Sequence, residues 1–262
     1  MLIISHFNQT TLIGKYLVRK KNCDMKNYNF FLFFSNKYSA IFFLSNFSKA
    51  FMALLCYKNG SVTRERIRNE EADGSWEYFN KLLNSTPRGN FGNIGLYYDY
   101  LEITPHNKKG DFRYNKANEK ATKFASPELE ARALIEGQFM AKRLHVEKMG
   151  FKTGAGRILV TGGGSVNTSI LQIIADVFNT PVYTQPETQN SAALGAAFRA
   201  RHVIQGGEEV LSFAESIKKE KLSDDSTEEQ NCIEPHKDAD SVYRPLLDRF
   251  KVLEDAITNG ES

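Results

Sequence analysis

Cysteine is scarce in this chain and follows no recognisable pattern. Three cysteines in 262 residues, Cys23, Cys56 and Cys232, are widely spaced, form no CxxC or Cys/His arrangement and cannot all pair. This spacing excludes a disulfide framework and a cysteine-based metal centre, so we expect no metal ligands here. It also favours a reducing compartment, and we expect the cytoplasm.

A strong charge imbalance is also missing. The 34 Lys and Arg residues face 31 Asp and Glu residues, and a net charge of +3 is too small to indicate a nucleic-acid-binding surface. The excess is local, because residues 1–50 carry seven basic residues and one acidic residue. We therefore expect small molecules or proteins as partners, and no nucleic acid.

Residues 1–50 form an atypical leader rich in Phe and Asn. Its most apolar part, "NYNFFLFFSNKYSAIFFLSNF" (27–47), is broken by "SNKYS", which would place Lys37 near mid-bilayer at a cost of about 3 kcal/mol. A membrane anchor is therefore disfavoured, and no small-residue cleavage site marks a secretory signal. We expect a poorly ordered segment foreign to the fold, from an alternative start or translated flanking sequence, followed by one domain over 51–262.

Strand and helix patterns alternate through that domain, which predicts an α/β layered fold with partly parallel strands. The first expected elements are a hairpin at 51–68 around Asn59-Gly60, a helix capped by Asp73 or Ser75, a glycine-rich loop and a strand at 96–103. A long helix then runs from Ser126 towards Gly150, and a strand follows at 157–161. The remaining elements are helices at 166–178 and 190–204 around the strand "PVYT", a loop at 215–240 and a final helix packed through Val242 to Ile257.

The stretch "RILVTGGGSVNTSILQIIADVF" (157–178) is the most informative one. Its strand ends in Gly162, Gly163 and Gly164 and opens directly into a helix, so bare backbone and free N–H groups face the same spot. Ser165 and Asn167 add polar side chains in the first turn, and Ser165 is a credible N-cap. Such a junction suits phosphate or ribose oxygens and a flat ligand.

Three known uses of a glycine turn compete at this junction. The Rossmann fingerprint requires a third glycine where this chain has Asn167, and a Walker A loop requires a lysine that is absent. A tight strand-to-helix turn that binds nothing remains open from the residues alone.

Five motifs in order resemble the FGGY carbohydrate kinases over about residues 52–257. They are "MALLCYKNGSVTRERIRN", "GNFGNIGLYYDYLEITP", "RALIEGQFMAKRLH", the glycine turn with its helix through "NTPVY", and "NSAALGAAFRA". The resemblance implies the C-terminal lobe of a ribonuclease H-like, actin-like ATPase fold, with a mixed sheet flanked by helices.

The same resemblance implies a nucleotide site at the glycine turn. Gly163 and Gly164 would line the nucleotide with Gly162 and Ser165 beside them, and Asn167 would hydrogen-bond near the adenine or ribose. Trp76 matches a tryptophan that the family places near ATP, although its helical spacing with Phe79 and Leu83 by itself favours a core residue.

Two further segments resemble parts of the family's nucleotide site, and ordinary helix structure also explains each of them. Arg132 and Glu136 resemble a helix beside the nucleotide, and their spacing also predicts an intrahelical ion pair. The small residues at 192–197 allow close helix packing, which would brace the adenine pocket.

The function implied by the resemblance is ATP- and Mg²⁺-dependent phosphorylation of D-xylulose to D-xylulose 5-phosphate, with glycerol, gluconate or ribulose as alternative substrates. The family's catalytic aspartate and sugar site match nothing in residues 1–50, and Asp24 stands in no such motif. We therefore identify no catalytic residue and expect no turnover from this chain alone. The alternatives are a non-catalytic nucleotide-binding or interaction module and an inert product.

Overall fold

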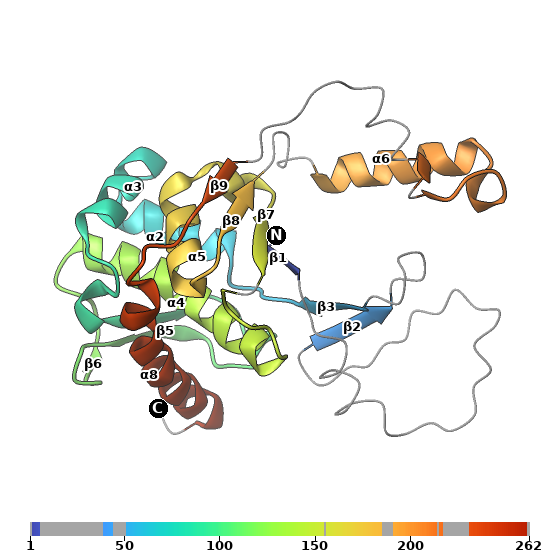
Figure 1. Ribbon diagram of the computed structural model, residues 1–262. Coiled ribbons are helices and arrows are strands. Elements are labelled where there is room, and N and C mark those ends of the chain that lie inside the picture. Colours follow the sequence, from blue (N-terminus) through green and yellow to red (C-terminus); the bar gives the residue numbers. More distant parts are fainter. Residues whose placement is uncertain are drawn as a thin grey trace, which may run out of the picture.

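The computed structural model describes residues 2–5, 39–43, 51–154, 156–184, 191–213, 215–216 and 231–260, which form both helices and strands (Figure 1). The helices are α2 (Ser61–Glu71), α3 (Trp76–Ser85), α4 (Pro127–Lys148), α5 (Thr168–Phe178), α6 (Ser191–Ile204) and α8 (Ala239–Asn259). The strands are β1 (Leu2–Ser5), β2 (Ser39–Phe43), β3 (Phe51–Leu55), β4 (Ile94–Tyr98), β5 (Gly110–Tyr114), β6 (Lys120–Ala121), β7 (Arg157–Val160), β8 (Val182–Thr184) and β9 (Asn231–Ile233). The 3₁₀ turns are η1 (Asn90–Gly92), η2 (Gly163–Val166) and η4 (Gly207–Glu209).

The described strands pair into three sheets. The largest has the order β1-β7-β8-β9, with β7 and β8 parallel and both outer pairs antiparallel. Helix α5 connects the two parallel strands, as a crossover between parallel neighbours requires. This mixed sheet flanked by helices is the α/β arrangement that the alternating pattern predicts.

Helix α4 is the centre of the core and contacts α2, α3, α5, α8 and β4. Its first turn has Pro127, Glu128 and Glu130, and its last has His145 and Lys148, which suit the ends of the helix dipole. It begins after Ser126, as predicted. Because neighbours surround it, it buries residues along most of its length, unlike a helix with one apolar stripe.

The hairpin predicted at 51–68 is wrong. Strand β3 ends at Leu55 and pairs with β2, while α2 begins at Ser61. Asn59 lacks the positive φ that a type I′ turn needs, and its side chain instead bonds to the backbone of Tyr100 at 2.9–3.0 Å. Hydrogen bonds to Tyr100, 41 residues later, therefore fix the backbone at Asn59, and helix α2 follows in place of a second strand.

The loop predicted at 215–240 is only partly correct. Residues 231–233 form β9, an edge strand of the main sheet, and α8 already begins at Ala239. Residues 217–230 lie outside the described part. The final helix is confirmed: it packs on the core through buried residues such as Tyr243, Phe250 and Ile257.

The leader contributes two described strands, β1 on the main sheet and β2 beside β3. The rest of the predicted leader, with Cys23, Asp24 and Lys37, lies outside the described residues. Among the residues that the structure describes, no helix is both long and apolar enough to cross a membrane. Cys56 and Cys232 are exposed free thiols.

Helix α6 differs from its predicted close packing. Figure 1 shows it standing apart from the helices around α4, and residues 193–197 are exposed. A Cβ at Gly195 would meet nothing within 4 Å. The bracing role of residues 192–197 therefore has no contact within the described part of the chain to support it.

Candidate functional site

The glycine turn leaves β7 through buried Thr161 and a glycine with positive φ. Gly162 has φ 81°, a conformation that only glycine adopts without strain. The N–H of Ser165 donates to the carbonyl of Gly162 at 3.0 Å, and the Ser165 hydroxyl donates to the same oxygen at 2.8 Å. Ser165 therefore closes the turn from inside, with only 7% of the residue exposed.

The next two glycines lie open. Gly163 and Gly164 are exposed, and a Cβ built at either would meet nothing within 4 Å. Val166 beside them is 63% exposed. The turn therefore presents bare backbone to solvent, with room for a flat ligand against it.

Asn167, and not Ser165, caps the helix that follows. Its Oδ1 accepts from the N–H of Ile170 at 3.1 Å, which places the start of α5 at Thr168. Its Nδ2 donates to Oδ1 of Asn80 on α3 at 2.8 Å. The predicted N-cap at Ser165 is wrong because that hydroxyl is already used within the turn.

Trp76 is the first residue of α3, which Ser75 caps as predicted by accepting from the N–H of Tyr78 at 3.2 Å. The indole meets the buried ring of Phe79 edge-on at 5.5 Å, and the guanidinium carbon of Arg68 lies 4.8 Å from its centroid. It is 37% exposed, so Trp76 packs on the core from one side and stays accessible from another.

Asn80 and Arg68 are the neighbours of this region that the sequence motifs miss. Asn80 lies one helical turn after Trp76 on the same face of α3. Arg68 reaches Trp76 from α2, a contact that arises only when α2 and α3 pack. No local spacing rule links either residue to the glycine turn.

Arg132 and Glu136 form the predicted ion pair, deep in the core. Arg132 Nε lies 2.6 Å from Glu136 Oε1, and the two side chains are only 7% and 1% exposed. The same oxygen accepts from Tyr243 of α8 at 2.7 Å and from the N–H of Gly89 at 3.0 Å. This network joins α4, α8 and the loop before η1, and burial raises the pKa of the Glu136 carboxyl.

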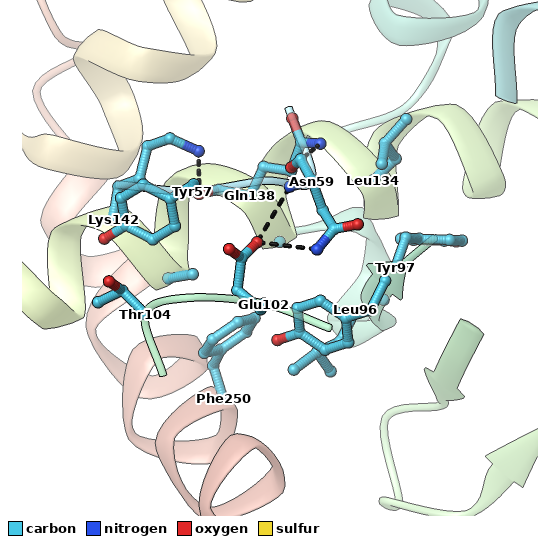
Figure 2. Close-up of a pocket in the computed structure, with 14 residues that line it drawn as sticks. Tyr57, Asn59, Leu96, Tyr97, Glu102, Thr104, Leu134, Gln138, Lys142 and Phe250 are labelled. Carbon is cyan, nitrogen blue, oxygen red and sulfur yellow. Dashed lines mark hydrogen bonds between the residues drawn. The ribbon is translucent and has the colours of Figure 1, made fainter. Parts of the chain in front are cut away.

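A separate small cavity of about 30 Å³ lies between α4 and β4 (Figure 2). Glu102 at its wall accepts N–H groups of Lys58 and Asn59 at 2.7 and 3.1 Å, and Gln138 donates to the carbonyl of Asn59 at 3.1 Å. Its lining shares no residue with the glycine turn. These bonds hold the start of α2 in place, and the cavity has room for roughly one water molecule.

Lys142 lies at the edge of that cavity, with its amine above the ring of Tyr57 at 4.7 Å and bonded to the carbonyl of Gln138 at 3.1 Å. Burial, followed by the nearby positive charge of Arg64, lowers the pKa of this amine to about 7, although Glu102 opposes the shift. Folding therefore carries a cost at neutral pH, because the unfolded amine stays protonated up to its ordinary value of 10.5.

Lys142→Met is expected to stabilise the protein more at pH 7 than at pH 10. Between these values the unfolded chain binds more protons at Lys142 than the folded chain, so wild-type stability rises with pH, while the variant lacks this contribution. The advantage of Lys142→Met should shrink by about 1–3 kcal/mol over that range, because partial exposure of the residue weakens the full effect. Urea unfolding of the variant and the wild type at each pH measures this difference in the free energy of unfolding. Lys116→Met, at an exposed lysine, is the control. If the free energy of unfolding depends on pH in the same way for both variants and the wild type, the lowered pKa of Lys142 is contradicted.

Comparison with known proteins gives the family. A family model described as the FGGY family of carbohydrate kinases, C-terminal domain, matches residues 35–203. The chain belongs to the FGGY family of carbohydrate kinases. The match begins inside the predicted leader and includes β2, before the boundary expected at residue 51.

The similar proteins include xylulose kinases. The chain is 46% identical to mouse xylulose kinase over 208 residues and 44% identical to the rat enzyme over 211 residues, covering 79% and 80% of this chain. It spans only 36% and 38% of the length of these relatives.

A solved structure supports the fold. The ligand-bound xylulose kinase of Lactobacillus acidophilus superposes with a TM-score of 0.63 at 20% identity, covering 86% of this chain and 44% of that one. The likeness confirms the predicted ribonuclease H-like, actin-like ATPase fold.

Proposed function

We propose that this chain is the nucleotide-binding lobe of a D-xylulose kinase, an enzyme that transfers a phosphoryl group from ATP to D-xylulose in the presence of Mg²⁺. The family membership and the identity to mammalian xylulose kinases support the reaction class and the sugar. The observation that carries the site is the open backbone at Gly163 and Gly164, beside a helix start held by Asn167.

The residues present fit the nucleoside part of ATP. A purine or ribose can lie on the exposed glycines without meeting a Cβ, and the half-exposed indole of Trp76 offers an apolar face. The amino end of α5 favours oxygen atoms with partial negative charge. Gly162 and Ser165 shape the turn from inside and support Gly163 and Gly164 indirectly.

ATP would supply the transferable phosphoryl group. The lobe itself binds and orients the nucleoside end and excludes water from one side of it. Within the described ranges, no group of three or more His, Cys, Asp or Glu side chains is placed to hold a metal ion. We propose that the catalytic base, the sugar site and the Mg²⁺ ligands belong to parts of the full enzyme with no counterpart identified in this chain, and that the enzyme works in the cytoplasm.

Binding of a non-hydrolysable ATP analogue is expected to change the fluorescence of Trp76, the only tryptophan in the chain. Gly164→Val should weaken that binding at least about tenfold, because the new side chain fills the space above the turn, where the structure has no other atoms. Its effect on the free energy of unfolding should stay within about 1 kcal/mol.

Gly195→Val is the matched control, since Gly195 on α6 also has open space around its Cβ position. Hydrogen exchange of residues 160–168 supplies a second readout, with protection expected on binding. If saturating analogue changes neither the emission nor the exchange, the turn is a structural one that binds nothing.

A further inference from the structure

We propose that Asn80 is a positioning residue of the nucleotide site, which ties α3, the helix that carries Trp76, to the amino end of α5. The inference rests on the proposed nucleotide site and adds a residue that no motif indicates. Its core is the hydrogen bond from Asn167 Nδ2 to Asn80 Oδ1 at 2.8 Å, between residues 87 positions apart.

Both ends of the Asn167 amide are engaged, which fixes its orientation. The oxygen caps α5 through the N–H of Ile170 at 3.1 Å, and the nitrogen points to Asn80. The amide nitrogen carries two hydrogens, and Asn80 is its one hydrogen-bond acceptor within the described part of the chain, which leaves the second hydrogen for a ligand. Asn80 therefore decides where that remaining donor points.

The same bond places Trp76. Trp76 and Asn80 are four residues apart on α3, so they are neighbours on one face of that helix, and α3 contacts α5. The buried ring of Phe79 supports the indole from the core, and Arg68 lies over it at 4.8 Å. A displacement of α3 relative to α5 would therefore change the position of the indole relative to the glycine turn.

Loss of this bond has a defined consequence for binding. Without Asn80 Oδ1 the Asn167 amide loses its partner on α3, and the two helices lose a polar contact between them. A ligand must then order both groups as it binds, and that cost reduces its affinity. The substitution should leave the hydrophobic core intact, because Asn80 is only half-buried and is not one of the buried residues of α3.

The test compares Asn80→Ala with Asn84→Ala in the full 262-residue chain. Asn84 is an exposed asparagine on the same helix, one turn further on. Titration with a non-hydrolysable ATP analogue, followed by Trp76 emission, should show about five- to tenfold weaker binding for Asn80→Ala and wild-type binding for Asn84→Ala. The emission change at saturation should also differ for Asn80→Ala, because the indole no longer holds the same position.

Asn80→Asp is the conservative variant, since it keeps an acceptor oxygen for Asn167. It should restore the wild-type emission change at saturation, which a purely structural role of Asn80 would not require. Asn80→Leu, which keeps the bulk of the side chain but has no acceptor oxygen, replaces Asn80→Ala should that variant fail to fold. If wild type binds the analogue and Asn80→Ala agrees with Asn84→Ala within about twofold, the positioning role is overturned and the nucleotide site stands. If wild type shows neither emission change nor exchange protection at 160–168, both proposals fail.

Discussion

Gly137→Ala is expected to lower the free energy of unfolding by more than about 4 kcal/mol or to prevent folding. A Cβ at Gly137 would overlap the carbonyl oxygen of Gly95, where α4 lies directly on β4. That oxygen belongs to the backbone of a buried strand, so it cannot move aside as a flexible side chain would. Urea unfolding followed by circular dichroism measures the loss.

This prediction opposes helix propensity, which makes it discriminating. Alanine in a helix interior is intrinsically favoured over glycine by about 1 kcal/mol, so local structure alone predicts stabilisation. Gly195→Ala on α6 is the matched control, because that helical glycine has no neighbour near its Cβ position. A neutral or stabilising Gly137→Ala would mean that α4 and β4 do not approach as closely as the structure shows.

Arg132→Met is expected to cost about 3–5 kcal/mol, because it leaves the carboxylate of Glu136 buried without its cation. Glu136 is 1% exposed, and its Oε2 has no hydrogen-bond partner among the described residues, so the charge depends on Arg132, Tyr243 and the N–H of Gly89. Arg132 also donates to the carbonyl of Leu83 at 3.1 Å, so its loss frees α3 as well. Chemical unfolding at pH 7 measures the effect.

Lys81→Met tests whether burial causes the effect. Lys81 and Glu77 form an ion pair with the same spacing on α3 at 2.8 Å, but both side chains are exposed, so no measurable change is expected there. The double variant Arg132→Met/Glu136→Leu should recover much of the lost stability, because it removes the uncompensated charge. Equal effects of Arg132→Met and Lys81→Met would show that the pair is solvated.

The candidate site shows what local sequence can predict. The glycines, the helix start after them and the capped start of α3 all follow from residues within a few positions of one another, and the structure places them as expected except that Asn167 replaces Ser165 as the cap. The role of Gly163, Gly164, Asn167 and Trp76 towards a nucleotide stays a prediction. Asn80 could not be found this way, because its partner is 87 residues away.

The failed hairpin has the same physical origin. Asn59-Gly60 is a strong local turn signal, yet Tyr100 and Glu102, more than forty residues later, supply the partners that turn the chain into α2. A turn propensity of about 1 kcal/mol cannot compete with several hydrogen bonds to distant residues, three of them to the Glu102 carboxylate. Whether a local turn signal is followed depends here on buried polar residues, and these form their hydrogen bonds only when distant segments meet in the folded chain.

The sequence by itself determined the helices from α3 onward, the β7-α5-β8 unit, the open glycine turn and the family, because each depends on residue type and short-range spacing. Only the tertiary structure decided that Gly137 must lack a side chain, that Arg132 and Glu136 are buried together and that α3 is tied to α5. These features depend on which surfaces meet, and the meeting of distant segments is set by the packing of the whole core.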